Sequence, residues 1–213
     1  MDESGEETAD QYRKKGLNSK FVYCDVSNSE QVNTLFANIV GDVGGIDVLV
    51  NNAGIFPRAD LQETNEVFWE KVMGVNLKGS YLMCQAAVPG MIRKGGGNIV
   101  NIGSLHASRG EDNTMAYAVS KGGIVTLTRN LAFSLNKHRI RVNGVHPGWV
   151  ASEGEVARIN AIGMDMDFVQ DKLATGGMQT GEDVANAVAF LASDLANQIT
   201  GEMITVSGGL GLR

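Results

Sequence analysis

The sequence predicts an α/β protein whose parallel sheet is covered by helices on both faces. Two observations carry this prediction. Short runs rich in Val and Ile alternate with longer stretches whose apolar residues recur at helical spacing. The segments 46–51 and 98–102 are almost uniformly apolar, as expected of central strands in a parallel sheet. Because no Pro-rich, Gly/Ser-rich or charged linker divides the chain, we expect one domain over residues 1–213.

The periodicity also places the individual elements. The expected strands are 20–25, 46–51, 98–102, 139–146 and 203–206. One helix begins at Ser27, where Glu30 completes a capping box. Its buried stripe consists of Val32, Leu35, Phe36 and Ile39. Further helices are expected over 77–93, 115–136 and 182–192, the last capped by Thr180 with Asp183 in its first turn.

The composition argues against nucleic-acid and membrane partners. The formal net charge is −6, and the lysines and arginines are scattered rather than gathered in a stripe. The N-terminal segment is acidic, and no apolar stretch approaches the ~18 residues that span a bilayer. We therefore expect a cytoplasmic protein. Cys24 and Cys84 have neither the number nor the spacing of a disulfide framework or a metal site, so no metal is expected.

Tyr117 and Lys121 stand four residues apart in a predicted helix, so their side chains project from the same face. A nearby ammonium favours the phenolate and lowers the pKa of a tyrosine, which would let Tyr117 exchange a proton with a substrate hydroxyl. Taken alone, the pair is better explained as an amphipathic face with a snorkelling lysine. Its interpretation therefore depends on the residues around it.

Two further polar residues follow or precede predicted elements. Ser104 comes directly after the strand 98–102, at the carboxyl edge where ligands bind in open parallel sheets. Its hydroxyl is able to bind a substrate carbonyl oxygen, or simply to form a turn or a helix cap. Asn76 precedes the helix 77–93, and on local grounds an N-cap role is the better interpretation.

The run Asn51-Asn52-Ala53-Gly54 ends the strand 46–51. A glycine at the carboxyl end of a strand lets a flat ligand approach the backbone closely, although an ordinary turn has the same composition. Asp25 also ends its predicted strand, so it is either a cap of the following helix or a ligand contact.

Together these residues resemble the signature of the short-chain dehydrogenase/reductase family. The motifs occur in the family's order and at its usual separations, and they are Asn51-Asn52-Ala53-Gly54, Asn76, Ser104, Tyr117-x-x-x-Lys121 and Pro147-Gly148. The resemblance extends from about Glu7 to Gly209. It implies a Rossmann-like, doubly wound parallel sheet and an oxidoreductase that uses NAD or NADP to interconvert alcohols and carbonyls.

The resemblance implies catalytic roles for four residues. Tyr117 would be the general acid/base, and Lys121 would lower its pKa and hold the nicotinamide ribose. Ser104 would orient the substrate oxygen, and Asn76 would anchor a water of the proton relay. The substrate would be a small alcohol or carbonyl compound, with His106, Trp149 and the segment 151–178 in its pocket and Met164, Met166 and Phe168 in an apolar lid. His106 is equally well explained as a solvent-facing loop residue.

Contacts with the cofactor are implied along the same edge. Asp25 and Val26 would contact the adenine. Asn51, Ala53 and Gly54 would lie on the adenosine side. Pro147, Gly148 and Val150 would pack on the nicotinamide, and the hydroxyl of Ser152, where the family commonly has Thr, would meet the carboxamide. Gly103 precedes Ser104 at a position where Ser is frequent in the family.

One departure from the family is large. Family members begin with a strand, a glycine-rich turn that opens a helix, and a second strand, and no segment before Asp25 has these features. We therefore expect the first β-α-β unit, which binds the pyrophosphate, to be missing. The absent strands would lie between 20–25 and 46–51, so an incomplete chain that is unstable or repacked is expected.

Two functional hypotheses follow. The leading one is an NAD(P)-dependent oxidoreductase. The alternative is a non-catalytic fragment or regulatory subunit that associates through the helices 77–93 and 115–136, which commonly form a four-helix interface in the family. By the same resemblance a homodimer or homotetramer is expected. Co-purification with a longer homologue would favour the alternative.

Overall fold

A computed structural model describes residues 3–165, 173, 175 and 177–210. The strands are β1 (Val48–Asn51), β2 (Gly97–Ile102), β3 (Ile140–Pro147) and β4 (Met203–Val206). The longer helices are α1 (Glu3–Lys14), α2 (Ser29–Val43), α3 (Glu66–Met73), α4 (Gly79–Lys94), α5 (Met115–Leu135), α6 (Glu153–Ala161) and α8 (Gly181–Ala192). Met166 and Phe168, two residues of the expected lid, lie outside the described residues.

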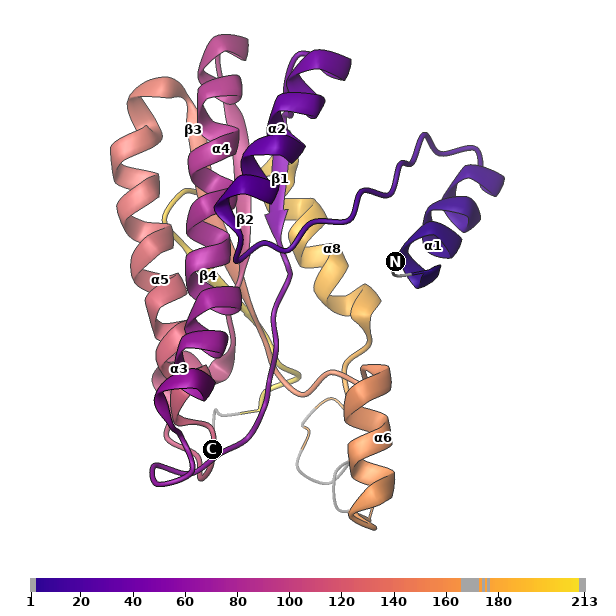
Figure 1. The fold of residues 1–213 in the computed structure, drawn as a ribbon, viewed down its shortest axis with the longest axis vertical. Helices are drawn as coiled ribbons and strands as arrows, with labels where there is room; N and C mark the ends of the chain where they lie inside the picture. Colours follow the sequence, from indigo (N-terminus) through magenta and orange to yellow (C-terminus); the bar gives the residue numbers. More distant parts are fainter. Residues whose placement is uncertain (1–2, 166–172, 174, 176, 211–213) are drawn as a thin grey trace.

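The four described strands form one parallel sheet in the order β1-β2-β3-β4. Helices α2, α4 and α5 cover one face, and α8 covers the other (Figure 1). Ile99 of β2 belongs to the core cluster beneath α2, α4 and α5, whereas the next residue, Val100, packs against Leu191 of α8. This alternation confirms the predicted α/β class with helices on both faces.

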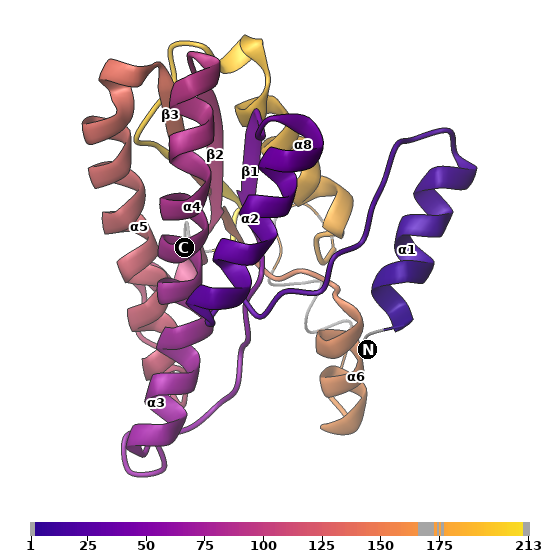
Figure 2. The ribbon, with the colours of Figure 1, turned by 45° about the horizontal axis from the view of Figure 1, so that its top comes forward.

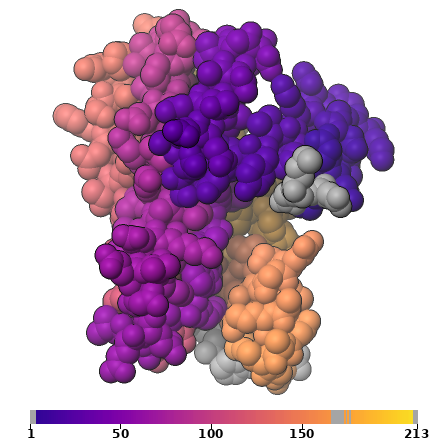
Figure 3. All heavy atoms as spheres, in the orientation of Figure 1, coloured from indigo at the N-terminus to yellow at the C-terminus, as the bar shows by residue number. Residues whose placement is uncertain are grey.

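Residues 20–25 do not form the predicted strand. They run as extended coil between α1 and α2, and Val22 and Tyr23 are 44% and 64% exposed. Figures 1 and 2 both show α1 standing apart from the sheet, and in the space-filling view it forms a lobe beside the main body (Figure 3). An apolar run becomes a strand only where a neighbouring strand pairs with its backbone, and here none does.

The strand β1 lies at an edge of the sheet rather than in its centre. Leu49 and Asn51 are buried beneath the α2 and α4 face, whereas Val48 and Val50 on the opposite face are 40% and 41% exposed. The expectation of a central strand at 46–51 is therefore wrong, although β2 is central as predicted. Among the described residues the sheet is not opened in its middle and ends at β1.

The predicted helices are present, with two corrections at their starts. The N-cap of α2 is Asn28, whose side chain accepts from the backbone N–H groups of Glu30 and Gln31, so the predicted capping box at Ser27 is wrong. Ser27 instead donates to Asp25. Thr180 and Asp183 form the predicted cap of α8 with both reciprocal hydrogen bonds.

The helix predicted from residue 77 begins earlier. One continuous helix runs from α3 through a π-helical turn, Gly74–Lys78, into α4. Asn76 lies inside this turn and is not a cap; the observed cap is Asn65, which accepts from the backbone N–H of Phe68. No helix among the described residues is long and apolar enough to cross a bilayer.

Candidate active site

Four predicted residues meet where the carboxyl end of β2 faces α5. Tyr117 and Lys121 project from α5, and Ser104 follows β2 directly. The Lys121 ammonium donates to the carbonyl of Ile102 at 2.8 Å and lies 5.7 Å from the centroid of the Tyr117 ring. Lys121 is only 5% exposed, so α5 and the end of β2 hold a buried cation beside the phenol.

Ser104 forms the helix cap that its position suggested, and its hydroxyl also faces Tyr117. Its side chain accepts from the backbone N–H of His106 and so caps the short 3₁₀ helix Leu105–Ser108. The same hydroxyl hydrogen-bonds to Tyr117. Its own backbone N–H donates to Nδ1 of His146 at 2.9 Å, which fixes the turn at the end of β2.

Asn76 ties the π-helical turn to the rest of the site. Its Oδ1 accepts from the backbone N–H of Ile55 at 2.8 Å, and its Nδ2 donates to the Ile55 carbonyl at 2.9 Å and to Ser120 Oγ at 3.1 Å. A Cβ on Gly54 would lie 3.4 Å from Asn76 Oδ1 and 3.6 Å from Lys121 Nζ. Since π-helical turns are frequent at functional sites, this irregularity is a feature of the site and not of the helix alone.

Burial dominates the electrostatics of the pair. It raises the pKa of the Tyr117 phenol above its ordinary value, and the hydrogen bond from Ser104 opposes this only in part. Burial also lowers the pKa of Lys121 to about 8. The causes of the shift at Tyr117 are burial and Ser104, while the Lys121 ammonium donates to the carbonyl of Ile102. That Lys121 lowers the pKa of Tyr117 stays a prediction.

His106 is part of an aromatic cluster at the site. Its ring contacts the rings of Phe56 and Tyr117 edge-on at centroid distances of 5.4 and 5.6 Å, and the Phe56 and Tyr117 rings are 4.1 Å apart. Nδ1 of His106 lies 3.2 Å from Ser104 Oγ, and Nε2 lies 2.7 Å from Glu111 Oε2. Phe56 and Glu111 were not predicted as site residues, because no local periodicity links them to the motif residues.

Arg58, also missed, connects this cluster to α6. Its guanidinium stacks 4.6 Å from the centroid of the Phe56 ring and lies 4.0 Å from Glu111 and 3.9 Å from Glu155. The Trp149 indole donates to Glu155 at 2.8 Å, which places the predicted pocket residue on the same rim. Charged and aromatic side chains therefore surround the approach to Tyr117.

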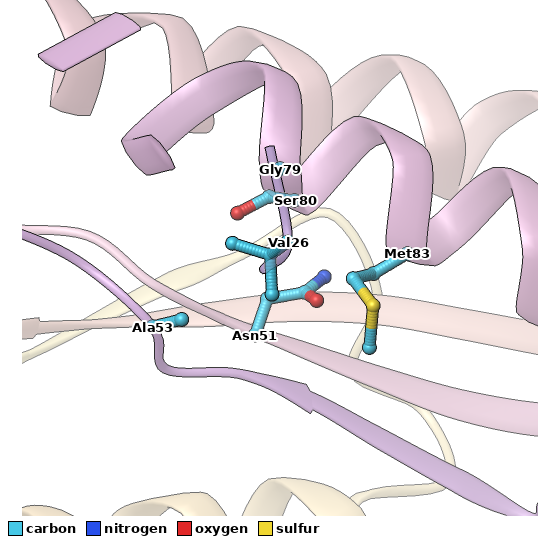
Figure 4. Close-up of a pocket in the computed structure, with 6 residues that line it drawn as sticks. All are labelled: Val26, Asn51, Ala53, Gly79, Ser80 and Met83. Atoms are coloured by element: carbon cyan, nitrogen blue, oxygen red, sulfur yellow. The ribbon is translucent and has the colours of Figure 1, made fainter. Parts of the chain in front are cut away.

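Three predicted cofactor residues lie together between the end of β1 and α4. Val26, Asn51 and Ala53 line a small cavity with residues of α4 (Figure 4). The cavity measures about 10 Å³, room for one water at most. The Nδ2 group of Asn51 donates to Asn101 and Cys84, so this amide nitrogen is engaged within the protein. Asp25 is exposed, and Ser27 donates to it, which keeps the pKa of that carboxyl low.

The predicted nicotinamide contacts follow β3. Pro147 ends the strand, and a Cβ on Gly148 would lie 2.7 Å from Gln179 and from Ser207, so the close backbone approach requires glycine. Val150 forms an isolated β-bridge with Gln179. Ser152 is the N-cap of α6 and accepts from the backbone N–H of Glu155 at 3.3 Å, which leaves its hydroxyl proton for another partner.

These residues fit the nicotinamide end of a dinucleotide. An ammonium has three donors, and Ile102 accepts one from the buried Lys121 in the described part of the chain, which suits the others to ribose hydroxyls. The described residues offer no comparable fit to the pyrophosphate of the dinucleotide. Among the described residues no strand is followed by a glycine-rich turn that opens a helix.

A parallel sheet with a half-buried Tyr117, a buried Lys121 and a serine at its carboxyl edge is typical of a nicotinamide-dependent oxidoreductase. The sequence comparisons agree. A family model described as enoyl-(acyl carrier protein) reductase matches residues 1–211. A 3-oxoacyl-[acyl-carrier-protein] reductase of Staphylococcus aureus is 36% identical over 208 residues, which are 98% of this chain and 83% of the relative.

Solved structures are similar as well. A gluconate 5-dehydrogenase from Burkholderia cenocepacia, in complex with NADP and tartrate, has a TM-score of 0.91 and 30% identity over 100% of this chain and 83% of its own. A short-chain dehydrogenase/reductase fold from Burkholderia xenovorans reaches a TM-score of 0.93 with 33% identity, covering 99% of this chain and 82% of that one. The chain therefore belongs to the short-chain dehydrogenase/reductase family, whose members use NAD or NADP.

Proposed function

We propose that Tyr117 is the general acid/base of an alcohol–carbonyl interconversion, with Ser104 and Lys121 as its partners. The observation that carries the proposal is the meeting of these three side chains at one point of the sheet edge. The cofactor supplies or accepts the hydride. Tyr117 gives its proton to the substrate oxygen during reduction, Ser104 donates a hydrogen bond to that oxygen, and Lys121 holds the ribose.

The raised pKa of Tyr117 keeps the phenol protonated at neutral pH, which favours its action as the acid in carbonyl reduction. Asn76 acts through position: its three hydrogen bonds hold the loop after β1 and the start of α5 in register. We also propose that the cofactor contacts run from the segment 25–26 across residues 51–54 to Pro147, Gly148, Val150 and Ser152.

The rim favours a small polar substrate. Arg58, His106, Glu111 and Glu155 present charges and hydrogen-bonding groups around the approach to Tyr117, and Trp149 presents an indole already bound to Glu155. A long aliphatic chain would desolvate these groups without partners. A hydroxylated carbonyl compound is therefore the substrate class that the site supports best.

The test is the variant Tyr117→Phe, which removes one hydroxyl and keeps the ring. Reduction of a hydroxylated ketone should fall by about 10²–10⁴-fold, the usual contribution of a general acid. The control Tyr12→Phe removes the same atom from an exposed position on α1 and should retain full activity. Undiminished activity in Tyr117→Phe would refute the assignment.

Cofactor binding is tested separately by thermal unfolding with excess NAD(H) or NADP(H). A ligand at one hundred times its Kd stabilises the native state by ~2.7 kcal/mol. A shift with one cofactor would support the proposed contacts in the chain as it stands. No shift with either would show that these residues do not suffice to bind the cofactor.

We further propose that the chain is cytoplasmic and forms a homodimer or homotetramer through α4 and α5. Tyr81 on α4 and Val119 and Phe133 on α5 are exposed, Phe133 to 89%. Apolar side chains of this size on neighbouring helices are typical of an interface. Phe133→Asp should convert the oligomer to a monomer in light-scattering measurements, and a monomeric wild type would refute the proposal.

A further inference from the structure

The backbone of Ser104 is held by a side chain and not by the sheet. A hydrogen bond from the Gly103 N–H to the Val145 carbonyl at 2.8 Å carries the β2–β3 ladder one residue past the end of β2. The next N–H, that of Ser104, donates instead to Nδ1 of His146 at 2.9 Å. Since Ser104 is only 6% exposed, this donor needs a partner inside the protein. The proposed function uses the Ser104 hydroxyl and gives no part to His146.

The imidazole of His146 is closely fitted at this position. Side chains alternate along a strand, so His146 lies on the same face of β3 as Val142, in the layer that α5 covers. A Cβ on Gly103 would lie 2.5 Å from Nδ1 of the ring and 2.8 Å from its Cε1, so the ring packs against the bare backbone of that glycine. Met203 of β4 approaches the same point, with its Cε 2.8 Å from that Cβ position. The ring therefore has little room to turn away from Ser104.

The hydrogen bond depends on the protonation state of the ring. A backbone N–H only donates, so Nδ1 is the unprotonated acceptor, and the proton of neutral His146 is on Nε2. In the imidazolium both ring nitrogens carry protons. Two donors would then face each other at Ser104, and this hydrogen bond would be lost.

The surroundings of His146 favour the neutral ring. Burial lowers the pKa of His146, and the positive charges of Lys121 and Arg129 on α5 lower it further. Gly103 and Met203, which approach the ring from the end of β2 and from β4, carry no charge. At neutral pH His146 is therefore an acceptor.

Ser104 is thus held from two sides. Tyr117 and His106, which also have titratable side chains, contact the Ser104 hydroxyl. His146 contacts the Ser104 backbone from β3. Because the hydroxyl and the backbone belong to one residue, a shift of the backbone also moves the hydroxyl.

We propose that His146 is a positioning residue, whose neutral imidazole fixes the backbone of Ser104 so that the Ser104 hydroxyl meets the substrate oxygen, and that protonation of Nδ1 releases Ser104. The inference rests on the proposed function of Ser104. A proton from water goes to Nδ1, the hydrogen bond from the Ser104 N–H breaks, and no covalent bond of the chain changes. Since a misplacement of about 1 Å is able to cost ~10²-fold in rate, catalysis falls as the ring becomes charged.

The first test removes the acceptor and keeps the shape of the side chain. His146→Asn carries Oδ1 on Cγ, where histidine carries Nδ1, so an acceptor for Ser104 is retained. His146→Leu has the same branching and no acceptor. For reduction of a hydroxylated ketone, kcat should fall by about 10- to 100-fold in His146→Leu with KM unchanged, whereas His146→Asn should keep most of the wild-type kcat. Full kcat in His146→Leu, a rise in KM alone, or an equal loss of kcat in both variants would make His146 a packing residue and overturn the inference.

The second test measures the pH profile, which packing alone would not change. In the wild type, kcat should fall in acid below about 6.5, the ordinary pKa of histidine, because the pKa of His146 is lowered from that value. Asparagine does not titrate, so this acid limb should disappear in His146→Asn. The control His138→Asn removes an imidazole beyond the far end of α5 and should keep the limb. An acid limb that persists unchanged in His146→Asn belongs to another group and would overturn the inference.

The third test needs no turnover. Nitrogen-15 NMR should detect a scalar coupling between the Ser104 amide and Nδ1 of His146 at neutral pH, and the coupling should vanish over the pH range in which kcat falls. The absence of this coupling at neutral pH would overturn the inference. Full activity in Ser104→Ala would instead refute the proposed function of the hydroxyl, while the coupling in the wild type would still report whether His146 holds the backbone.

Discussion

The π-helical turn between α3 and α4 is expected to depend on one side chain. Asn76→Ala removes three hydrogen bonds and leaves the partly buried backbone groups of Ile55 without partners. At about 1 kcal/mol for each bond the loss amounts to ~3 kcal/mol. For a chain of this length that corresponds to a fall in Tm of roughly 6–12 °C.

A matched variant separates this effect from the ordinary cost of replacing asparagine. Asn28→Ala deletes the same atoms from the N-cap of α2, where the side chain accepts two backbone hydrogen bonds at an exposed position. Its expected cost is about 1 kcal/mol. Both variants are measured by urea unfolding followed by circular dichroism. If Asn76→Ala is destabilised no more than Asn28→Ala, the turn is held by the helix backbone and the reasoning fails.

Two further predictions concern β2 and α5. Gly103→Ser should destabilise the chain by about 1–3 kcal/mol, because a Cβ there would lie 2.5 Å from His146 Nδ1. A double-mutant cycle with His146→Ala should recover part of that loss, and strict additivity would contradict the contact. The pKa of Lys121 is lowered to about 8 in the folded state, so the unfolded chain binds more protons above that pH and stability rises. Relative to Lys121→Met, the unfolding free energy of the wild type should therefore increase by about 1 kcal/mol between pH 8 and 9. A flat difference would refute the burial of the ammonium.

The sequence predicted the elements whose patterns are local. The cap of α8 and the central position of β2 are found as expected, and Val32 and Phe36 of the predicted α2 stripe are buried, whereas Leu35 and Ile39 are half-buried. The prediction of a strand at 20–25 was wrong for a physical reason. Apolar residues indicate a tendency to form a strand, but a strand also requires a neighbouring backbone to pair with.

The site was predictable only in part, for a similar reason. Tyr117 and Lys121 are a helical turn apart, so their proximity follows from spacing alone. Asn76 was interpreted locally as a cap, yet its partners are 21 and 44 residues distant. The contacts of Arg58 with Glu111 and Glu155 are likewise made only in the folded chain.

Buried asparagine side chains in the sheet favour one alignment of its strands. Asn51 of β1 stands opposite Asn101 of β2, to which its side chain donates, and Asn101 in turn donates to Thr128 of α5. Aliphatic residues on parallel strands pack almost equally well after a shift of two positions. A shifted pairing would bury these amides without partners, at a cost of ~1–3 kcal/mol for each orphaned group. These hydrogen-bonded side chains therefore specify the register of β1 against β2. They raise the free energy of misaligned pairings during folding, which the apolar contacts alone would not do.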